Sequence, residues 1–550
     1  MRKAIQAASL AAFTALFVLA TYRLPDWLPA DLYLRIDPLL GIDALVSSRA
    51  FIGRALTALV LVGATLALGR FFCAYVCPLG VVLDGLDFTL FRKAGRAALK
   101  GEKGLRRLKY GLLVLIFAAA LAGAGLAYLF DPIAFLTRVY TFFLYPLAVA
   151  LANGVLDLFR PLFMQFGWVS FSHLRYPQPV FYMALPTLAL FIAVVAAGRL
   201  APRFWCRYLC PLGALLSLIS PLGLFKRRVS ESCDRCLACR RSCPMGAIGE
   251  DPFKTRRPEC IQCRRCADVC PKKAITFSAA FGPVGEYATP DISRRGLVAS
   301  LAGGVALGFV SLKSPFTPLA GKRQLIRPPG ALPESEFMRT CIRCGECMKA
   351  CVTNTLQPCL WESGLTGLWT PKMEPRMAPC EPNCNVCGKV CPTQAIRSLP
   401  LEEKTCAKVG TAVLAKERCL VWAQDKQCLI CDEICPYNAI VFRVVEGRRR
   451  PFVVASRCNG CGYCEQRCPV GGSSAIVVVT DGEIRLAEGS YVAEARRLQL
   501  DFRPDPGDDR FEIEETRPGP ERRGEEGTGE GQRPDPPAGT SAPVMPRGFL

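Results

Sequence analysis

The stretch Cys260-Ile-Gln-Cys263-Arg-Arg-Cys266-Ala-Asp-Val-Cys270-Pro271 decides the fold of the segment that contains it. A run of the same spacing, from Cys233 to Cys243-Pro244, precedes it. In bacterial two-cluster ferredoxins, three cysteines of such a run bind one [4Fe–4S] cluster and the fourth binds the other. Zinc ribbons would show two CxxC pairs instead. We therefore expect two clusters with the ligand sets Cys233, Cys236, Cys239 and Cys270, and Cys260, Cys263, Cys266 and Cys243.

Four more runs of this kind follow later in the chain: Cys341, Cys344, Cys347 and Cys351; Cys380, Cys384, Cys387 and Cys391; Cys419, Cys428, Cys431 and Cys435; and Cys458, Cys461, Cys464 and Cys468. The long gap before Cys428 makes Cys419 the least regular ligand. Crosswise ligation exchanges the fourth cysteines within each pair of runs, so Cys391 completes the Cys341 run and Cys351 the Cys380 run. Cys468 likewise joins the Cys419 set and Cys435 the Cys458 set. The sequence thus predicts six [4Fe–4S] clusters in α+β ferredoxin modules.

The six runs use 24 of the 30 cysteines, and six remain. Cys359 and Cys406 stand alone and are expected to be small buried hydrophobic residues. The other four form a repeat, Arg70-Phe-Phe-Cys73-Ala-Tyr-Val-Cys77-Pro and Arg203-Phe-Trp-Cys206-Arg-Tyr-Leu-Cys210-Pro. The spacing places both cysteines of each CxxxCP unit near one face of a helical turn. We expect a redox or metal role, in which the four thiols hold a metal or cluster or cycle as dithiols.

The chain has one histidine, His173, which excludes a bis-histidine haem, a Rieske centre and a CxxCH haem attachment site within the chain. No flavin or nucleotide fingerprint follows a plausible strand. We therefore expect no haem and no flavin. His173 lies in a loop rich in Arg, Tyr and Pro, where it is either an exposed residue or a base in quinol deprotonation.

Four apolar stretches are long enough to cross a bilayer: Ala4–Tyr22, Phe51–Gly69, Gly111–Phe130 and Val180–Gly198. The basic residues between the second and third stretches and after the fourth predict cytoplasmic loops, and so a cytoplasmic N-terminus. The net charge of +21 comes without a nucleic-acid motif, so no nucleic-acid partner is expected. We expect an α-helical four-span domain over residues 1–225, in the inner membrane of a bacterium.

The remaining domains follow from the cysteine runs and from changes in composition. Residues 226–290 are expected to be a cytoplasmic two-cluster module, and residues 321–500 a periplasmic four-cluster domain. Between them, in residues 291–320, Ser293-Arg294-Arg295 precedes an apolar stretch that is either a twin-arginine export signal or a fifth span. A third interpretation keeps the later clusters in the cytoplasm and makes 296–312 a buried helix. Residues 501–550 have the composition of a disordered tail.

The four-span domain with two CxxxCP units, followed by a two-cluster ferredoxin, resembles the NapH/MauN family of ferredoxin-type membrane proteins. The later runs, such as Cys341-Ile-Arg-Cys-Gly-Glu-Cys347 and Cys428-Leu-Ile-Cys-Asp-Glu-Ile-Cys435-Pro, resemble the NapG family. The chain therefore looks like a fusion of the two. The resemblance implies a quinol dehydrogenase subunit or an electron carrier that passes electrons from the quinone pool to a periplasmic reductase.

A second hypothesis is an accessory or maturation factor, whose CxxxCP thiols reduce a metal or a partner protein during enzyme assembly. Three acidic residues near the predicted membrane edge, Asp84, Asp87 and Asp131, are either proton acceptors or residues of loops and helix caps.

Overall fold

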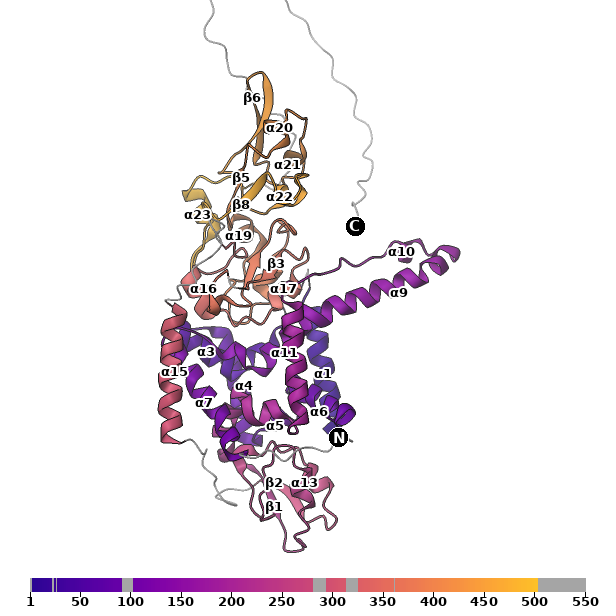
Figure 1. Cartoon of the computed structure of the whole chain (residues 1–550), viewed down its shortest axis with the longest axis vertical. Helices are drawn as coiled ribbons and strands as arrows, with labels where there is room; N and C mark the ends of the chain where they lie inside the picture. Colours follow the sequence, from indigo (N-terminus) through magenta and orange to yellow (C-terminus); the bar gives the residue numbers. More distant parts are fainter. Residues whose placement is uncertain are drawn as a thin grey trace, which may run out of the picture.

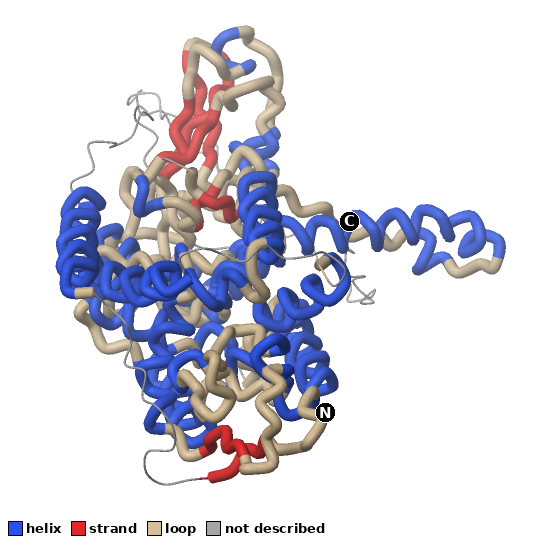
Figure 2. The backbone as a smooth tube through the Cα atoms, turned by 60° about the horizontal axis from the view of Figure 1, so that its bottom comes forward, coloured by secondary structure: helices blue, strands red, loops and turns tan. Residues whose placement is uncertain are grey.

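The computed structural model describes residues 2–21, 24–25, 27–91, 102–279, 293–312, 325–360 and 362–502. Figure 1 shows three parts stacked along the long axis: a helical body, a small module at one end and a C-terminal domain at the other. Strands occur only in the two end parts of the described chain, as the tube in Figure 2 shows. The predicted disordered tail lies almost entirely outside the described residues.

The helical body consists of two successive halves. The first half contains α1 (Arg2–Leu19), α2 (Leu32–Arg35), α3 (Pro38–Ser48), η1 (Gly53–Thr57), α4 (Ala58–Leu68), α5 (Phe71–Tyr75) and α6 (Pro78–Leu90). The second half contains α7 (Glu102–Leu121), η2 (Ala127–Leu129), α8 (Pro132–Val139), η3 (Tyr140–Leu144), α9 (Tyr145–Gln165), α10 (Val169–Ser172), α11 (Ala184–Ala196), η4 (Ala197–Arg199), η5 (Trp205–Leu209), α12 (Pro211–Ile219) and η6 (Ser220–Leu222).

The two halves share more than their cysteines. In the first half the Asp37 side chain caps α3 by accepting hydrogen bonds from the backbone N–H groups of Leu39 and Leu40. In the second half Asp131 caps α8 in the same way. In both, a proline at the first helical position follows the aspartate, where its missing N–H costs nothing. Each half then ends with a CxxxCP unit whose proline begins the last helix. The body is thus an internal repeat.

The region from Asp131 to Pro179 lies between two of the expected spans and was not itself expected to be one. It forms the continuous helical stretch Pro132–Gln165, which comprises α8, η3 and α9. Helices α9 and α10 project from the body as an arm (Figure 1). Pro161, a charged pair and Asn153-Gly154 interrupt the apolar pattern of α9, and this interruption hid the helix.

Two helices among the described residues are long and apolar enough to cross a membrane by length and composition, Arg2–Leu19 and Pro132–Gln165. The expected second and fourth spans coincide with shorter apolar helices, Gly53–Leu68 and Ala184–Arg199. The expected third span extends beyond the end of α7 at Leu121. The four-span topology therefore stays a prediction.

Helix α15 (Arg294–Leu312) lies along α7 in both views (Figures 1 and 2). Gly304 lies against the Leu115 backbone and Ala118, and Gly308 lies against Ala122. A side chain at either glycine would collide with α7, so the small-xxx-small spacing is what allows this close approach. The stretch 296–312 is therefore a helix packed on α7, whichever role the preceding Arg294 and Arg295 have.

The small module pairs β1 (Phe225–Val229) with β2 (Ile275–Ala279) in an antiparallel ladder, with Phe225 opposite Ala279. Between the strands lie α13 (Ala238–Ser242), η7 (Arg257–Glu259) and α14 (Arg265–Asp268). The strands bring the two ends of the module together, so both cysteine runs lie in the loops and short helices between them.

The C-terminal domain consists of short elements joined by cysteine-bearing loops. In order they are α16 (Glu334–Thr340), α17 (Glu346–Ala350), β3 (Leu356–Pro358), η8 (Leu365–Gly367), β4 (Pro371–Met373), α18 (Val386–Lys389), α19 (Leu401–Cys406), β5 (Thr411–Leu414), α20 (Leu420–Ala423), α21 (Ile430–Glu433), β6 (Ile440–Val445), β7 (Arg448–Val453), α22 (Tyr463–Arg467), β8 (Ile476–Val479) and α23 (Tyr491–Arg497). The pairs β3–β4, β5–β8 and β6–β7 form two-stranded sheets. Sheets this small bury little apolar surface, so much of the interior is built from cysteines.

Candidate iron–sulfur centres

The first two runs of the C-terminal domain exchange their fourth cysteines. Cys347 is close enough to Cys341, Cys344 and Cys391 for electrostatic interaction, and these four form the proximal set. Cys387 interacts in the same way with Cys380, Cys384 and Cys351, which form the second set. Each set is the donor group that the crosswise assignment requires.

The last two cysteine runs of the C-terminal domain are arranged in the same crosswise way. The third set consists of Cys464, Cys461, Cys458 and Cys435, which interact with one another. The distal set combines Cys431 with Cys428 and Cys419, and Cys468 packs in the same cluster as Cys419 and Cys428. Cys419 therefore lies with its predicted partners, despite the long gap that separates it from Cys428.

The four sets follow one another in a line. Cys347 of the proximal set interacts with Cys387 of the second. The Cys380 N–H of the second set donates to the Cys461 carbonyl of the third at 2.8 Å. Cys464 of the third set in turn interacts with Cys431 of the distal set. The line starts at α16 and α17 beside the body and runs to α20 and α21 near the far end of the domain (Figure 1).

The small module holds the other two predicted sets. Cys260 interacts with Cys243, Cys263 and Cys266. Cys239 interacts with Cys233, and Cys270 packs against the cluster that contains Cys239. Cys236, the remaining ligand, is exposed on its loop.

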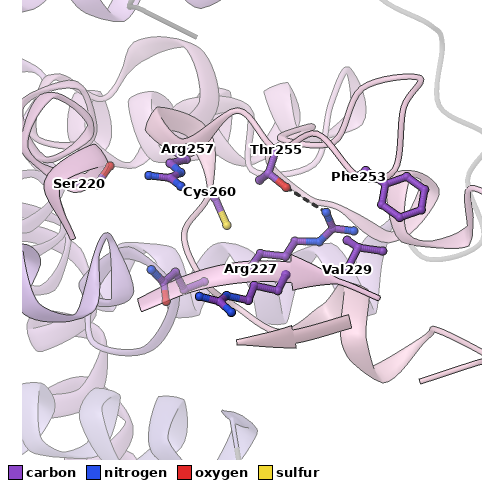
Figure 3. Close-up of a pocket in the computed structure, with 9 residues that line it drawn as sticks. Ser220, Arg227, Val229, Phe253, Thr255, Arg257 and Cys260 are labelled. Carbon is purple, nitrogen blue, oxygen red and sulfur yellow. Dashed lines mark hydrogen bonds between the residues drawn. The ribbon is translucent and has the colours of Figure 1, made fainter. Parts of the chain in front are cut away.

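A cavity of about 360 Å³ lies beside Cys260, and its sulfur points into the cavity in Figure 3. Arg227 and Arg257 stand on the cavity wall. The Arg227 guanidinium is held by the Pro252 carbonyl at 2.8 Å and the Thr255 hydroxyl at 2.9 Å. A guanidinium held in this position would stabilise the negative charge of an iron–sulfur cluster bound at Cys260.

Backbone N–H groups point at several of the sulfurs. Ala247 N–H donates to Cys243 Sγ at 3.3 Å, and Ala439 N–H donates to Cys435 Sγ at the same distance. Ile396 N–H donates to Cys391 Sγ at 3.4 Å. All three acceptors are the Cys of a Cys-Pro pair. Such bonds stabilise anionic thiolates and tune the reduction potential of a bound cluster. The donor sets therefore fit [4Fe–4S] clusters.

The two CxxxCP units meet at one place in the body. Cys210 interacts with Cys206 of its own unit and with Cys73 and Cys77 of the other. Three of the four are buried, and the Gly213 N–H donates to Cys210 Sγ at 3.2 Å. We call these four residues the CxxxCP set. The sequence indicated the repeat, and the structure adds that its two halves face each other.

Two buried arginines connect the CxxxCP set with the small module. Arg203 binds both carboxylate oxygens of Asp84 at 2.8 Å and interacts with Cys206 and with Cys263 of the module. Arg70 interacts with Cys73 and Cys210, and donates to the Pro258 carbonyl of the module at 2.5 Å. Both arginines belong to the repeat motif, but their contacts with the module cannot be inferred from the motif alone.

Two groups of aromatic rings lie in the body, one beside the CxxxCP set and one at the contact with the C-terminal domain. Trp205, next to Cys206, stacks on Phe135 at 5.6 Å and on Phe130 at 6.2 Å. At the contact, the Tyr128 ring lies 6.4 Å from Trp369 of the C-terminal domain. The guanidinium of Arg343, two residues from Cys341, lies 4.3 Å from the Tyr128 ring centre.

The other residues singled out in the sequence have simpler surroundings. Cys359 is fully buried, as expected, and Cys406 is partly buried. Asp131 is a helix cap and Asp84 is ion-paired. Asp87 lies within α6. His173 is exposed at the end of α10, on the arm.

Three family models match four parts of the chain. A "4Fe-4S dicluster domain" model matches residues 232–275, and a second model of that description matches 426–472. A "4Fe-4S binding domain" model matches residues 50–96 and 183–230, which contain the two CxxxCP units. No solved structure matches the chain.

Curated relatives match over most of their length. The methylamine utilization ferredoxin-type protein MauM of Paracoccus denitrificans is 36% identical over 203 residues, which are 35% of this chain and 87% of the relative. The ferredoxin-type protein NapH of Haemophilus influenzae is 30% identical over 264 residues, 44% of this chain and 77% of the relative. The ferredoxin-type protein NapG of Escherichia coli is 37% identical over 176 residues, 30% of this chain and 73% of the relative.

Fold, cysteine sets and relatives together define an iron–sulfur electron-transfer protein of the ferredoxin type. The chain belongs to the family of ferredoxin-type proteins that includes MauM, NapG and NapH. The predicted resemblance is confirmed, and the matches are consistent with a fusion of NapH-like and NapG-like parts.

Proposed function

We propose that this chain passes electrons from membrane quinol to a periplasmic reductase, through [4Fe–4S] clusters held by its cysteine sets. The observation that carries the proposal is the line of four sets from the body to the far end of the C-terminal domain. A bound [4Fe–4S] cluster takes up and releases single electrons. A line of such sites leads away from the body, as a carrier with a distant partner requires.

Exposed apolar side chains support a membrane location for the body. They include Leu59 and Val60 on α4, Leu158 on α9 and Leu185 on α11, all at least 63% exposed. Exposed large apolar side chains on three helices are what a membrane-facing body would present. In the inner membrane of a bacterium, the small module would face the cytoplasm and the C-terminal domain the periplasm.

The CxxxCP set supplies a candidate seventh centre between the two ferredoxin parts. Three of its four thiols are buried, which favours a bound cluster over a dithiol that exchanges with partner proteins, because exchange needs access to the sulfur. Arg70 and Arg203 bring it next to the module, and the two groups of aromatic rings lie beside it and at the contact with the C-terminal domain. This arrangement offers a route between clusters on opposite faces of the membrane.

The accessory-factor hypothesis is the second candidate, and the same observation weighs against it. A factor that reduces a partner through its thiols needs them at a surface, whereas Cys77, Cys206 and Cys210 are buried. It also leaves the line of four sets in the C-terminal domain without a purpose.

The test uses the purified full chain with its clusters oxidised. We expect added quinol to bleach the visible absorbance of the clusters and to give the electron paramagnetic resonance signal of reduced [4Fe–4S] clusters. A sample without quinol should stay oxidised. Clusters that remain oxidised in both samples would sink the conduit proposal and favour the accessory role.

The periplasmic location has its own test. A reporter that is active only after export, fused behind Thr480, should be active, and a reporter active only in the cytoplasm should be silent at the same position. The reverse pattern would place the C-terminal domain in the cytoplasm.

A further inference from the structure

We propose that a cavity at the junction of the body and the C-terminal domain binds the head group of the quinol. The cavity lies between the end of α1, the base of α9 and the loop after α17, and its volume is about 680 Å³. We call it the junction cavity. The inference rests on the proposed function and locates the binding site of its substrate.

The size and lining of the junction cavity fit an aromatic head group. Small-molecule sites in proteins usually measure about 300–1,000 Å³ and are mostly apolar with a few polar groups. Here the apolar wall includes Val18 of α1, Val149 and Ala152 of α9, and Val180. The cavity lies at the root of the apolar arm, where a hydrophobic molecule could enter from the lipid.

The neighbour across the cavity is a predicted cluster ligand. Cys351, which completes the second set, lines the cavity together with Thr353. A head group in the cavity would therefore lie beside the second set. Oxidation of a quinol to a quinone releases two electrons and two protons. The oxidants are the iron–sulfur centres of the proposed function, and the protons leave to water.

Two polar side chains in the wall are placed to hold the quinol hydroxyls. The Asn354 amide group donates to the Val180 carbonyl at 2.9 Å. Its Oδ1 atom is buried and accepts no hydrogen bond among the described residues. A buried acceptor without a partner is costly, and a bound quinol would relieve that cost once the amide turns this oxygen into the cavity. Tyr145 at the start of α9 provides a second hydroxyl in the wall.

A fixed positive charge completes the site. The Lys349 ammonium group also lines the cavity, 5.6 Å from the centre of the Tyr145 ring. Its N–H groups are directed at the carbonyls of Phe17, Val18 and Ala20 at the end of α1. Lys349 also interacts with the buried Glu346 carboxyl, so its charge is shared between that group and a head group in the cavity.

The location has a consequence for the path of the electrons. The junction cavity touches the C-terminal domain directly, so electrons from quinol enter the line of four sets without crossing the body. The small module and the CxxxCP set then form a separate branch of the protein.

The test compares two tryptophan substitutions on α9 in the full chain with its clusters. Ala148 lines the junction cavity, and Ala150, two residues further on, does not line it and is also exposed. We expect Ala148→Trp to weaken binding of decylubiquinone and of a short-chain menaquinone analogue at least tenfold, and Ala150→Trp to bind like the wild type. Asn354→Leu should weaken binding by a similar factor. Iron content and thermal unfolding of each variant show that it has folded.

A second readout is independent of substitution. An azidoquinone, activated by light, should label peptides that contain residues 145–152 or 349–354. Labelling elsewhere, or equal binding by Ala148→Trp and wild type, overturns the location while quinol reduction of the clusters still stands. A wild-type chain that binds neither quinone and is not reduced by quinol overturns the location and the proposed function together.

Discussion

The small module and the C-terminal domain are both ferredoxin parts, yet they join the helical body in different ways. The buried contact of the module is centred on one acid: Glu259 lies 2.6 Å from the Lys109 ammonium and 4.0 Å from Arg70. Arg106, which donates to the Gly246 carbonyl at 3.0 Å, and the Arg265–Asp84 ion pair at 3.4 Å add to it. The C-terminal domain is held through backbone carbonyls at the ends of helices and loops. Lys349 binds the end of α1, Arg343 donates to Gly125 at 3.1 Å, and Ser47 donates to Arg339 at 2.7 Å.

This difference indicates which substitutions should weaken each of the two contacts with the body. Removing the partner of a buried charge is strongly destabilising, so the Glu259 carboxylate is the most sensitive single group of the module's contact. In the contact of the C-terminal domain with the body, several residues share the hydrogen bonds, so each contributes less to the stability of the contact. The predictions below test this contrast, beginning with the largest effect.

Loss of the CxxxCP set should stop electron transfer between the sets of the small module and those of the C-terminal domain. We expect Cys206→Ser to lose the iron of that set, because a four-thiolate site rarely survives the loss of a ligand. The quinol-dependent reduction of the C-terminal sets should persist, since the junction cavity lies on their side. Iron analysis and absorbance after quinol addition check both points. Cys359→Ser is the matched control, and iron lost equally from both variants would contradict the assignment.

Glu259→Gln should loosen the small module. The substitution leaves Lys109 and Arg70 buried without a counter-charge, which typically costs about 3–5 kcal/mol. Limited proteolysis should release the module faster than in the wild type. Glu250→Gln, at an exposed position of the same module, should behave like the wild type. Equal protection of both variants would mean that other contacts hold the module.

Lys349→Met should weaken the other junction to a smaller degree. It leaves carbonyl groups at the end of α1 without a donor, at about 1–3 kcal/mol for an unsatisfied buried group. Hydrogen exchange should accelerate in the last turn of α1 and in α17. The exposed Lys426→Met is the control, and unchanged exchange at α1 would show that water replaces the ammonium group.

The smallest effect concerns Glu334 within the C-terminal domain. Burial would raise its pKa, but Arg327 and Arg485 lower it to about 2. Because the folded pKa is depressed, the stabilisation is present above pH 4.5 and is lost as the pH falls towards 2. Its exposed side chain limits the effect to under about 1 kcal/mol.

Thermal unfolding between pH 3 and pH 6 measures the Glu334 effect. The wild type should lose more stability over this range than Glu334→Gln. If the unfolding temperatures of the two proteins fall in parallel with pH, Glu334 does not contribute to the pH dependence of stability.

The cysteine sets could be predicted from sequence because cluster ligands come at short, fixed spacings. Even the crosswise partner, such as Cys391 for Cys341, follows from the two-run pattern. Long-range features could not be predicted. The approach of Cys73 and Cys77 to Cys206 and Cys210 depends on how the two halves of the body pack. The Asp37 and Asp131 caps are Asp-Pro pairs, a signal too short to notice alone.

The junction cavity was equally hidden, because it is assembled from α1, α9 and residues 349–354, which lie far apart in the chain. Helix α9 was itself missed, since a proline and a charged pair interrupt its apolar pattern. The sequence thus predicted the donor atoms of the centres, whereas their order in space and the substrate cavity required the fold.

Helix α15 connects the body to the C-terminal domain within one chain and is anchored on α7 by its glycines. Joining two binding partners by a short connection in one chain typically gives them an effective concentration in the millimolar range. A junction too weak to hold two separate subunits together at cellular concentrations would still be closed most of the time. Each body also receives one C-terminal domain, so dilution and unequal synthesis cannot separate the quinol cavity from the centres beside it.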